Sequence, residues 1–113
     1  MIGSYNKDLF IDLARQIKDV LTEDVRQIIL YGSRARGDYN EGSDLDIIVL
    51  VDIRDNETMV DYRKKMNLLA SRFGLEHDIM ISISVKRLDL FELQKEYLPY
   101  YKNVMNEGIQ LYG

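Results

Sequence analysis

The sequence predicts a small α/β domain of the α+β kind, in which a mixed β-sheet carries helices packed on one face. Apolar residues recur at helical spacing in several segments, and β-branched runs separate these segments. The resulting order is helix, strand, loop, strand, helix, strand, helix, which is typical of such a domain. With 113 residues, of which 46% are hydrophobic, the chain fits one domain over residues 1–113. The second face of the sheet is then open for a ligand.

Three segments have the pattern of amphipathic helices. The first follows the capping residues Ser4 and Asn6 and has apolar positions at Leu9, Phe10, Leu13, Ile17, Val20 and Leu21. The second covers residues 56–73, and Gly74 is expected to end it. The third begins at residue 87, is interrupted at Pro99 and resumes as far as Gly108.

Three segments have the pattern of strands. Residues 25–31 are a short β-branched run that ends at Gly32, and residues 44–52 are a second, more continuously apolar run. Residues 76–85 alternate, with apolar side chains on one face and Asp78, Met80, Ser82 and Ser84 on the other. The segment between the first two strands, GSRARGDYNEGS, is rich in glycine, serine and charge and is expected to be a loop.

Composition excludes several classes of protein. The chain has no cysteine, so it has neither disulfides nor a thiolate zinc site. The N-terminus lacks the pattern of a signal peptide, and no apolar run approaches membrane-spanning length, so we expect a cytoplasmic protein without membrane contact. A formal net charge of −4 argues against an extended nucleic-acid surface, but a local pocket for one nucleotide and a basic protein partner both remain compatible with it.

Asp44 and Asp46 are two positions apart on a predicted strand, so both side chains leave the same face. Two carboxylates so close repel each other unless a cation lies between them, and hard oxygen ligands suit Mg²⁺ or Mn²⁺. The alternative is structural: Asp44 caps a turn and Asp46 lies at an exposed strand end. The pair by itself leaves both interpretations open.

Gly32 and Ser33 follow a predicted strand directly and precede Arg34 and Arg36. Glycine allows a sharp turn and a close approach to a ligand, while the serine hydroxyl and the following amides can donate to phosphate oxygens. An ordinary surface turn with solvated arginines is the alternative. The spacing excludes a Walker loop and a three-glycine dinucleotide motif, and DYNEGSDLD does not fit an EF-hand loop.

Gly32-Ser33, ten intervening residues and Asp44-Leu45-Asp46 resemble the signature of the DNA polymerase β-like nucleotidyltransferase superfamily. Residues 31–49, YGSRARGDYNEGSDLDIIV, look like its minimal nucleotidyltransferase (MNT) branch. The resemblance implies that Ser33 and the neighbouring amides hold the terminal phosphates. It also implies that Asp44 and Asp46 bind two Mg²⁺ ions, with Mn²⁺ as an alternative, and that a third strand supplies another carboxylate.

Asp78 is the candidate for that third carboxylate, because it precedes the alternating run on its open face. It would bind the catalytic metal or accept the proton of an attacking hydroxyl. Its alternative role is that of a plain residue at a strand start. Arg34 and Arg36 would neutralise phosphate charge, although solvated arginines are again the simpler interpretation.

The resemblance also implies a function. Stand-alone MNT domains are commonly encoded beside HEPN-domain proteins, as toxin–antitoxin pairs in which the transferase adenylylates its partner and silences it. The donor would be ATP and the acceptor a tyrosine, serine or threonine hydroxyl of the HEPN toxin. One alternative is a non-catalytic module that neutralises its partner by direct contact. Another is transfer to a small molecule such as an aminoglycoside, which generally needs an additional substrate-binding domain.

Two further features are left outside the site. His77 lies beside Asp78, but a lone histidine at a strand start is usually structural or solvated. Tyr97, Tyr100 and Tyr101 would form an interface patch or offer hydroxyls that accept a nucleotide, but aromatic residues at such spacing usually pack in the core.

Overall fold

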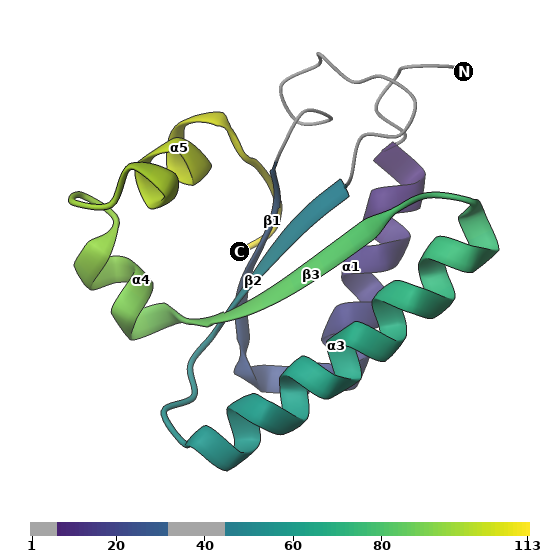
Figure 1. Ribbon diagram of the computed structural model, residues 1–113, viewed down its shortest axis with the longest axis horizontal. Coiled ribbons are helices and arrows are strands. Elements are labelled where there is room, and N and C mark those ends of the chain that lie inside the picture. Colours follow the sequence, from purple (N-terminus) through teal and green to yellow (C-terminus); the bar gives the residue numbers. More distant parts are fainter. Residues whose placement is uncertain (1–6, 32–44) are drawn as a thin grey trace.

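The computed structural model describes residues 7–31 and 45–113 as an α/β fold built on one sheet (Figure 1). In chain order the elements are α1 (Lys7–Leu21), the 3₁₀ helix η1 (Thr22–Asp24), β1 (Val25–Tyr31), β2 (Leu45–Val51), α3 (Asn56–His77), β3 (Ile81–Arg87), α4 (Leu88–Gln94), α5 (Pro99–Glu107) and β4 (Ile109–Tyr112). The strand order is β3-β2-β1-β4. Strand β1 is antiparallel to β2 and β4, whereas β2 and β3 are parallel. The predicted mixed sheet is confirmed.

Helices α1 and α3 pack on one face of the sheet, where they bury the larger core cluster (Figure 1). Because side chains alternate along a strand, every second residue of β2 faces these helices. The residues of this cluster that are fully or almost fully buried include Phe10, Leu13, Ile17, Leu45, Ile47, Val49, Met66, Leu69 and Phe73. Because α1 and α3 each bury one side against this face, their apolar residues recur at helical spacing in the sequence.

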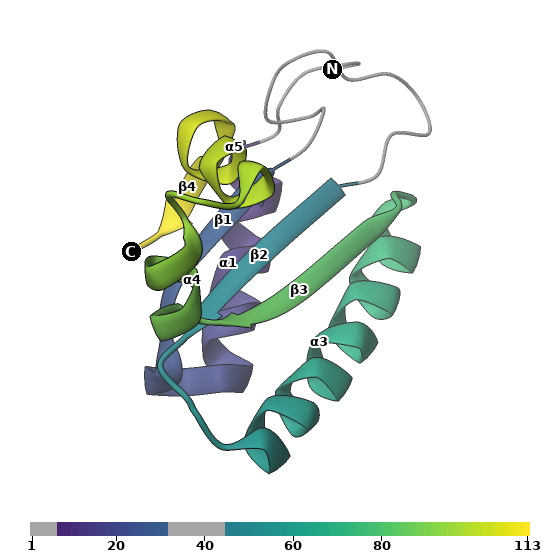
Figure 2. The ribbon, with the colours of Figure 1, turned by 60° about the vertical axis from the view of Figure 1, so that its left-hand side comes forward.

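Helices α4 and α5 lie over the second face, beside β1 and β2 (Figure 2). They bury a smaller cluster composed of Ile29, Ile48, Leu50, Phe91 and Val104. The sequence predicted helices on one face, and the structure adds a second, partial layer. The part of this face formed by β3 is not fully covered, because Ser82 is exposed and Ser84 and Lys86 are half-buried. The open surface for a ligand is therefore narrower than predicted.

Helix α3 extends beyond the predicted end at Phe73 to His77, and Gly74 lies inside it. Asp78 ends the helix with a left-handed backbone (φ 55°, ψ 48°), and the amide of Ile79 donates to the carbonyl of Gly74 at 3.0 Å. A Cβ at Gly74 would lie 2.7 Å from the carbonyl oxygen of Ile79. The glycine therefore permits a close contact with the capping turn instead of ending the helix. The predicted strand start at residue 76 is wrong, since β3 begins at Ile81.

The termini of α3 and α5 follow local signals. The carboxylate of Asp55 caps α3 by accepting hydrogen bonds from the Thr58 amide at 2.9 Å and the Thr58 hydroxyl at 2.7 Å. Pro99 is the first residue of α5, where its missing amide proton costs no helical hydrogen bond. The predicted interruption at Pro99 is confirmed, because α4 ends at Gln94.

Strand β4 was not predicted. It has only four residues, and it gains its place by pairing with β1 at the edge of the sheet. Within residues 7–31 and 45–113, none of the helices combines the length and apolar character needed to cross a membrane.

Candidate active site

The candidate site lies at the edge of the sheet where β1 ends and β2 and β3 begin (Figure 2). Asp46 is the second residue of β2, and its Cα partners are Tyr31 on β1 and Ser82 on β3. Residues in register share a face of a sheet, so these three side chains lie side by side. Leu45 and Ile47 point the other way, into the core cluster under α1 and α3. The acidic side chain is thus held on the face that remains partly open.

Most of the predicted phosphate-binding and metal-binding residues lie outside the described residues, namely Gly32, Ser33, Arg34, Arg36 and Asp44. The residues that flank this segment are described. Tyr31 pairs with Asp46 across β1 and β2, and the amide of Leu45 donates to the carbonyl of Met80 at 2.8 Å. The two halves of the sequence motif therefore start from adjacent strands at one edge.

The sequence predicted that Asp78 lies on a strand. The structure places it instead in the capping turn of α3. It is exposed, and two residues separate it from the start of β3, which enters the same edge of the sheet as β2. A left-handed backbone is tolerated by aspartate because its short polar side chain can bond locally. Its role as a third carboxylate remains a prediction. His77 is exposed in the last turn of α3, where its ring contacts Phe73 with the centroids 4.3 Å apart.

Ser82 is the β3 side chain in register with Asp46, and it was not among the predicted site residues. The alternation of residues 76–85 already placed Ser82 on the same face as Asp78. The alternating pattern therefore indicated Ser82 as well. Because the predicted strand start was five residues too early, the prediction selected Asp78 instead. A serine hydroxyl beside a carboxylate can donate to a ligand or accept from it.

Aromatic side chains border the other side of Asp46. The rings of Tyr31 and Tyr100 meet edge to face, with centroids 5.7 Å apart and an angle of 86°. Tyr100 also contacts Tyr101 at 5.7 Å, and Tyr101 contacts Phe91 at 4.9 Å. Burial raises the pKa of the Tyr100 phenol, and the negative charge of Asp46 raises it further. A row of aromatic rings therefore extends from the smaller core cluster to the end of the sheet that carries Asp46, which we call the acidic edge.

The predicted core role of the tyrosines is confirmed for Tyr101, which packs against the smaller cluster. It is wrong for Tyr97, which is 79% exposed. Tyr100 lies between these extremes, packed on other rings and 46% exposed.

Metal binding depends on oxygen ligands at this edge. Asp46 offers a carboxylate and Ser82 a hydroxyl, and Mg²⁺ prefers such hard donors. The described part of the chain holds no group of three or more His, Cys, Asp or Glu side chains arranged for a metal ion. Asp44, the nearest additional carboxylate in the sequence, is outside that part.

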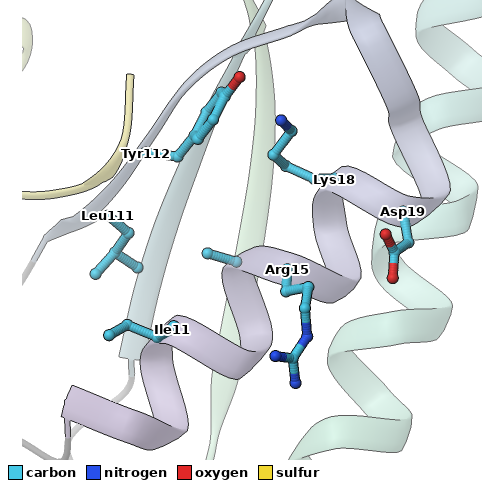
Figure 3. Close-up of a pocket in the computed structure, with 7 residues that line it drawn as sticks. Ile11, Arg15, Lys18, Asp19, Leu111 and Tyr112 are labelled. Carbon is cyan, nitrogen blue, oxygen red and sulfur yellow. The ribbon is translucent and has the colours of Figure 1, made fainter.

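A separate groove of about 340 Å³ lies between α1 and β4 (Figure 3). Its lining includes Arg15, Lys18 and the carboxylate of Asp19, and the ammonium group of Lys18 lies 4.0 Å from the ring centroid of Tyr112. The groove adjoins α1, which covers the face of the sheet opposite to that of Asp46. It lacks a pair of carboxylates, so it does not compete with the edge as a transfer site.

Comparisons with known proteins agree with the resemblance of the motif. A family model described as "Nucleotidyltransferase domain" matches residues 13–110. A Methanocaldococcus jannaschii protein named "Putative protein adenylyltransferase MJ0141" is 38% identical over 71 residues, which cover 63% of this chain and 69% of that protein.

Solved structures share the fold. A toxin–antitoxin structure with AMP-PNP has a TM-score of 0.57 and 23% identity, and the match covers 96% of this chain and 74% of that one. A Shewanella oneidensis complex of a tri-AMPylated HEPN toxin with an MNT antitoxin has a TM-score of 0.53 and 22% identity, covering 96% and 73%. The chain, with its acidic edge and its glycine-serine motif, therefore belongs to the nucleotidyltransferase domain family.

Proposed function

We propose that this chain transfers AMP from ATP to a hydroxyl group of a HEPN-domain toxin and thereby acts as its antitoxin in the cytoplasm. The observation that carries the proposal is the position of Asp46, which lies beside the end of β1 and the start of β3 in a chain of the nucleotidyltransferase family. The relative named for protein adenylylation and the solved complex with an AMPylated HEPN toxin support the choice of acceptor. The complex with AMP-PNP supports ATP as the donor.

The residues of the motif have distinct roles in this proposal. Ser33 and the amides after Gly32 would hold the terminal phosphates, and Arg34 and Arg36 would offset their charge. Asp44 and Asp46, with Asp78 as a third carboxylate, would hold two Mg²⁺ ions, or Mn²⁺ in their place. Bound divalent ions would stabilise the negative charge that develops during phosphoryl transfer and lower the pKa of the acceptor hydroxyl.

The reaction itself is a displacement at the α-phosphorus of ATP. The oxygen of the acceptor hydroxyl forms a bond to this phosphorus, the bond to the bridging oxygen of the β-phosphate breaks, and pyrophosphate leaves. The proton of the hydroxyl passes to a carboxylate at the edge, for which Asp78 is the candidate. The chain contributes mainly by holding both reactants in line, so the rigid β2 strand is a suitable support for Asp46.

The test is transfer of label from ATP, in the presence of Mg²⁺, to the HEPN protein encoded beside this chain. GTP, CTP and UTP serve as competing donors. We expect label on the partner with the wild type and none with the double variant Asp44→Ala plus Asp46→Ala. Asp52→Ala is a matched control, because Asp52 directly follows β2 at the opposite end from Asp46 and its side chain forms an exposed ion pair with Arg26. This control should retain transfer.

The non-catalytic alternative predicts a different result. If the wild type and the double variant both silence the partner and neither transfers label, the chain neutralises its partner by binding alone. Exposed apolar side chains on α4 and the following turn, such as Leu93 at 67% and Tyr97 at 79%, are suited to such contact.

A further inference from the structure

Tyr31 connects the two halves of the motif. It is the last residue of β1 and precedes Gly32 in the sequence, and its Cα partner on β2 is Asp46. A side chain that packs on Tyr31 therefore lies close both to the acidic edge and to the point where the glycine-serine motif begins.

Tyr100 is the side chain in that position. Its ring packs edge to face on Tyr31, and its neighbour Tyr101 is anchored on Phe91 in the smaller core cluster. Because Pro99 starts α5 directly before it, the backbone at Tyr100 is fixed by the first helical turn. The ring is thus held by its neighbours on a short helix that is anchored in the smaller core cluster by Val104.

In the part of the chain that the structure describes, the hydroxyl of Tyr100 is available to a ligand. The side chain is 46% exposed, and its hydroxyl forms no hydrogen bond with any other residue in the ranges 7–31 and 45–113. A tyrosine phenol is protonated at neutral pH, so it can donate a hydrogen bond. A neutral phenol attracts an anionic oxygen, whereas a phenolate would repel it.

We infer that the Tyr100 hydroxyl donates a hydrogen bond to a phosphate oxygen of the nucleotide bound at the Asp46 edge. This inference rests on the proposed function, since it requires that a nucleoside triphosphate binds there. It assigns a binding role to a residue outside the glycine-serine and aspartate motif. The ring of Tyr100 supports the site by packing, and the hydroxyl contacts the ligand.

The test compares Tyr100→Phe with the wild type, because this change removes the hydroxyl and keeps the ring contacts. Calorimetric titration with AMP-PNP and Mg²⁺ should show about tenfold weaker binding, as expected when a hydrogen bond to a charged group is lost. Titration with inorganic triphosphate and Mg²⁺ should show a loss of the same size, since the contact is to phosphate. Tyr97→Phe is the matched control and should bind like the wild type, because Tyr97 is exposed on the adjoining turn.

Three results would overturn the inference in separable ways. Wild-type affinity for AMP-PNP in Tyr100→Phe, with binding lost in Asp46→Asn, would remove Tyr100 from the site and leave the proposed function intact. A loss for AMP-PNP without a loss for triphosphate would place the contact on the nucleoside. No binding by the wild type would refute the proposed function together with the inference. A thermal unfolding midpoint equal to that of the wild type would show that the variant is correctly folded.

Discussion

The two faces of the central sheet have different chemistry along the same strand. On the face under α1 and α3, Leu45, Ile47 and Val49 continue an apolar surface from one end of β2 to the other. On the opposite face, Leu50 and Ile48 are buried under α4 and α5, but Asp46 follows them at the edge. One face of β2 is therefore apolar along the whole strand. The other face is apolar at Leu50 and Ile48 and carries a carboxylate at Asp46.

This difference shows how a short chain can hold a charged site without weakening its core. The strand that carries Asp46 is anchored by the apolar side chains of its other face, so the carboxylate does not need to be buried to be held in place. The two faces should therefore respond differently to mutation, and two experiments test that separation.

The largest effect should come from the apolar face. Phe73→Ala in α3 removes a fully buried ring and should lower the free energy of unfolding by about 3–5 kcal/mol, measured by urea denaturation. Leu68→Ala on the same helix is the control, because Leu68 is 71% exposed and its loss should cost little. Nucleotide affinity of the folded fraction should not change. An altered affinity would show that the two faces are not independent.

The next effect concerns the acidic edge. Asp46→Asn should reduce transfer by about a hundredfold or more, as is typical when a charged catalytic group is lost, while the urea midpoint stays close to that of the wild type. Asp78→Asn should also reduce transfer, by about tenfold or more, because the proposed function gives Asp78 the role of third carboxylate and proton acceptor. Asparagine also tolerates the left-handed backbone. Transfer at the wild-type rate by Asp78→Asn would remove Asp78 from the proposed site.

The smallest effect is a dependence of stability on pH at the start of α3. Hydrogen bonds from Thr58 lower the pKa of Asp55 below its ordinary value of 3.8. The capping contribution is therefore fully present above that value and is lost as the pH falls through the lower pKa of the folded state. Thermal melts of Asp55→Ala and the wild type should differ at neutral pH, and the difference should shrink as the pH falls below 3.8 and through the lower pKa of the folded state. Asp55→Asn, which caps without titrating, should show no such convergence, and a constant difference for Asp55→Ala would contradict the assignment.

Several elements could be predicted from the sequence because their signals are local. Residues 25–31 form β1 as predicted, since a β-branched run followed by glycine needs no distant contact to be recognised. The start of α3 at Asn56 and the break at Pro99 follow from capping and from the missing amide of proline. The motif from Gly32 to Asp46 was sufficient to predict the family, because its spacing is specific in combination.

Other features depend on contacts between residues far apart in the chain. Helix α3 continues through Gly74 because this glycine meets the carbonyl of Ile79, and that shift moves Asp78 out of the strand. Ser82 lies beside Asp46 through the register of two parallel strands, and Tyr100 reaches Tyr31 only because α5 folds back over β1. Periodicity gives the face on which a side chain lies, but register and helix docking decide which side chains meet there. The sequence alone therefore predicted the acidic edge, while the residues that surround Asp46 depended on the tertiary structure.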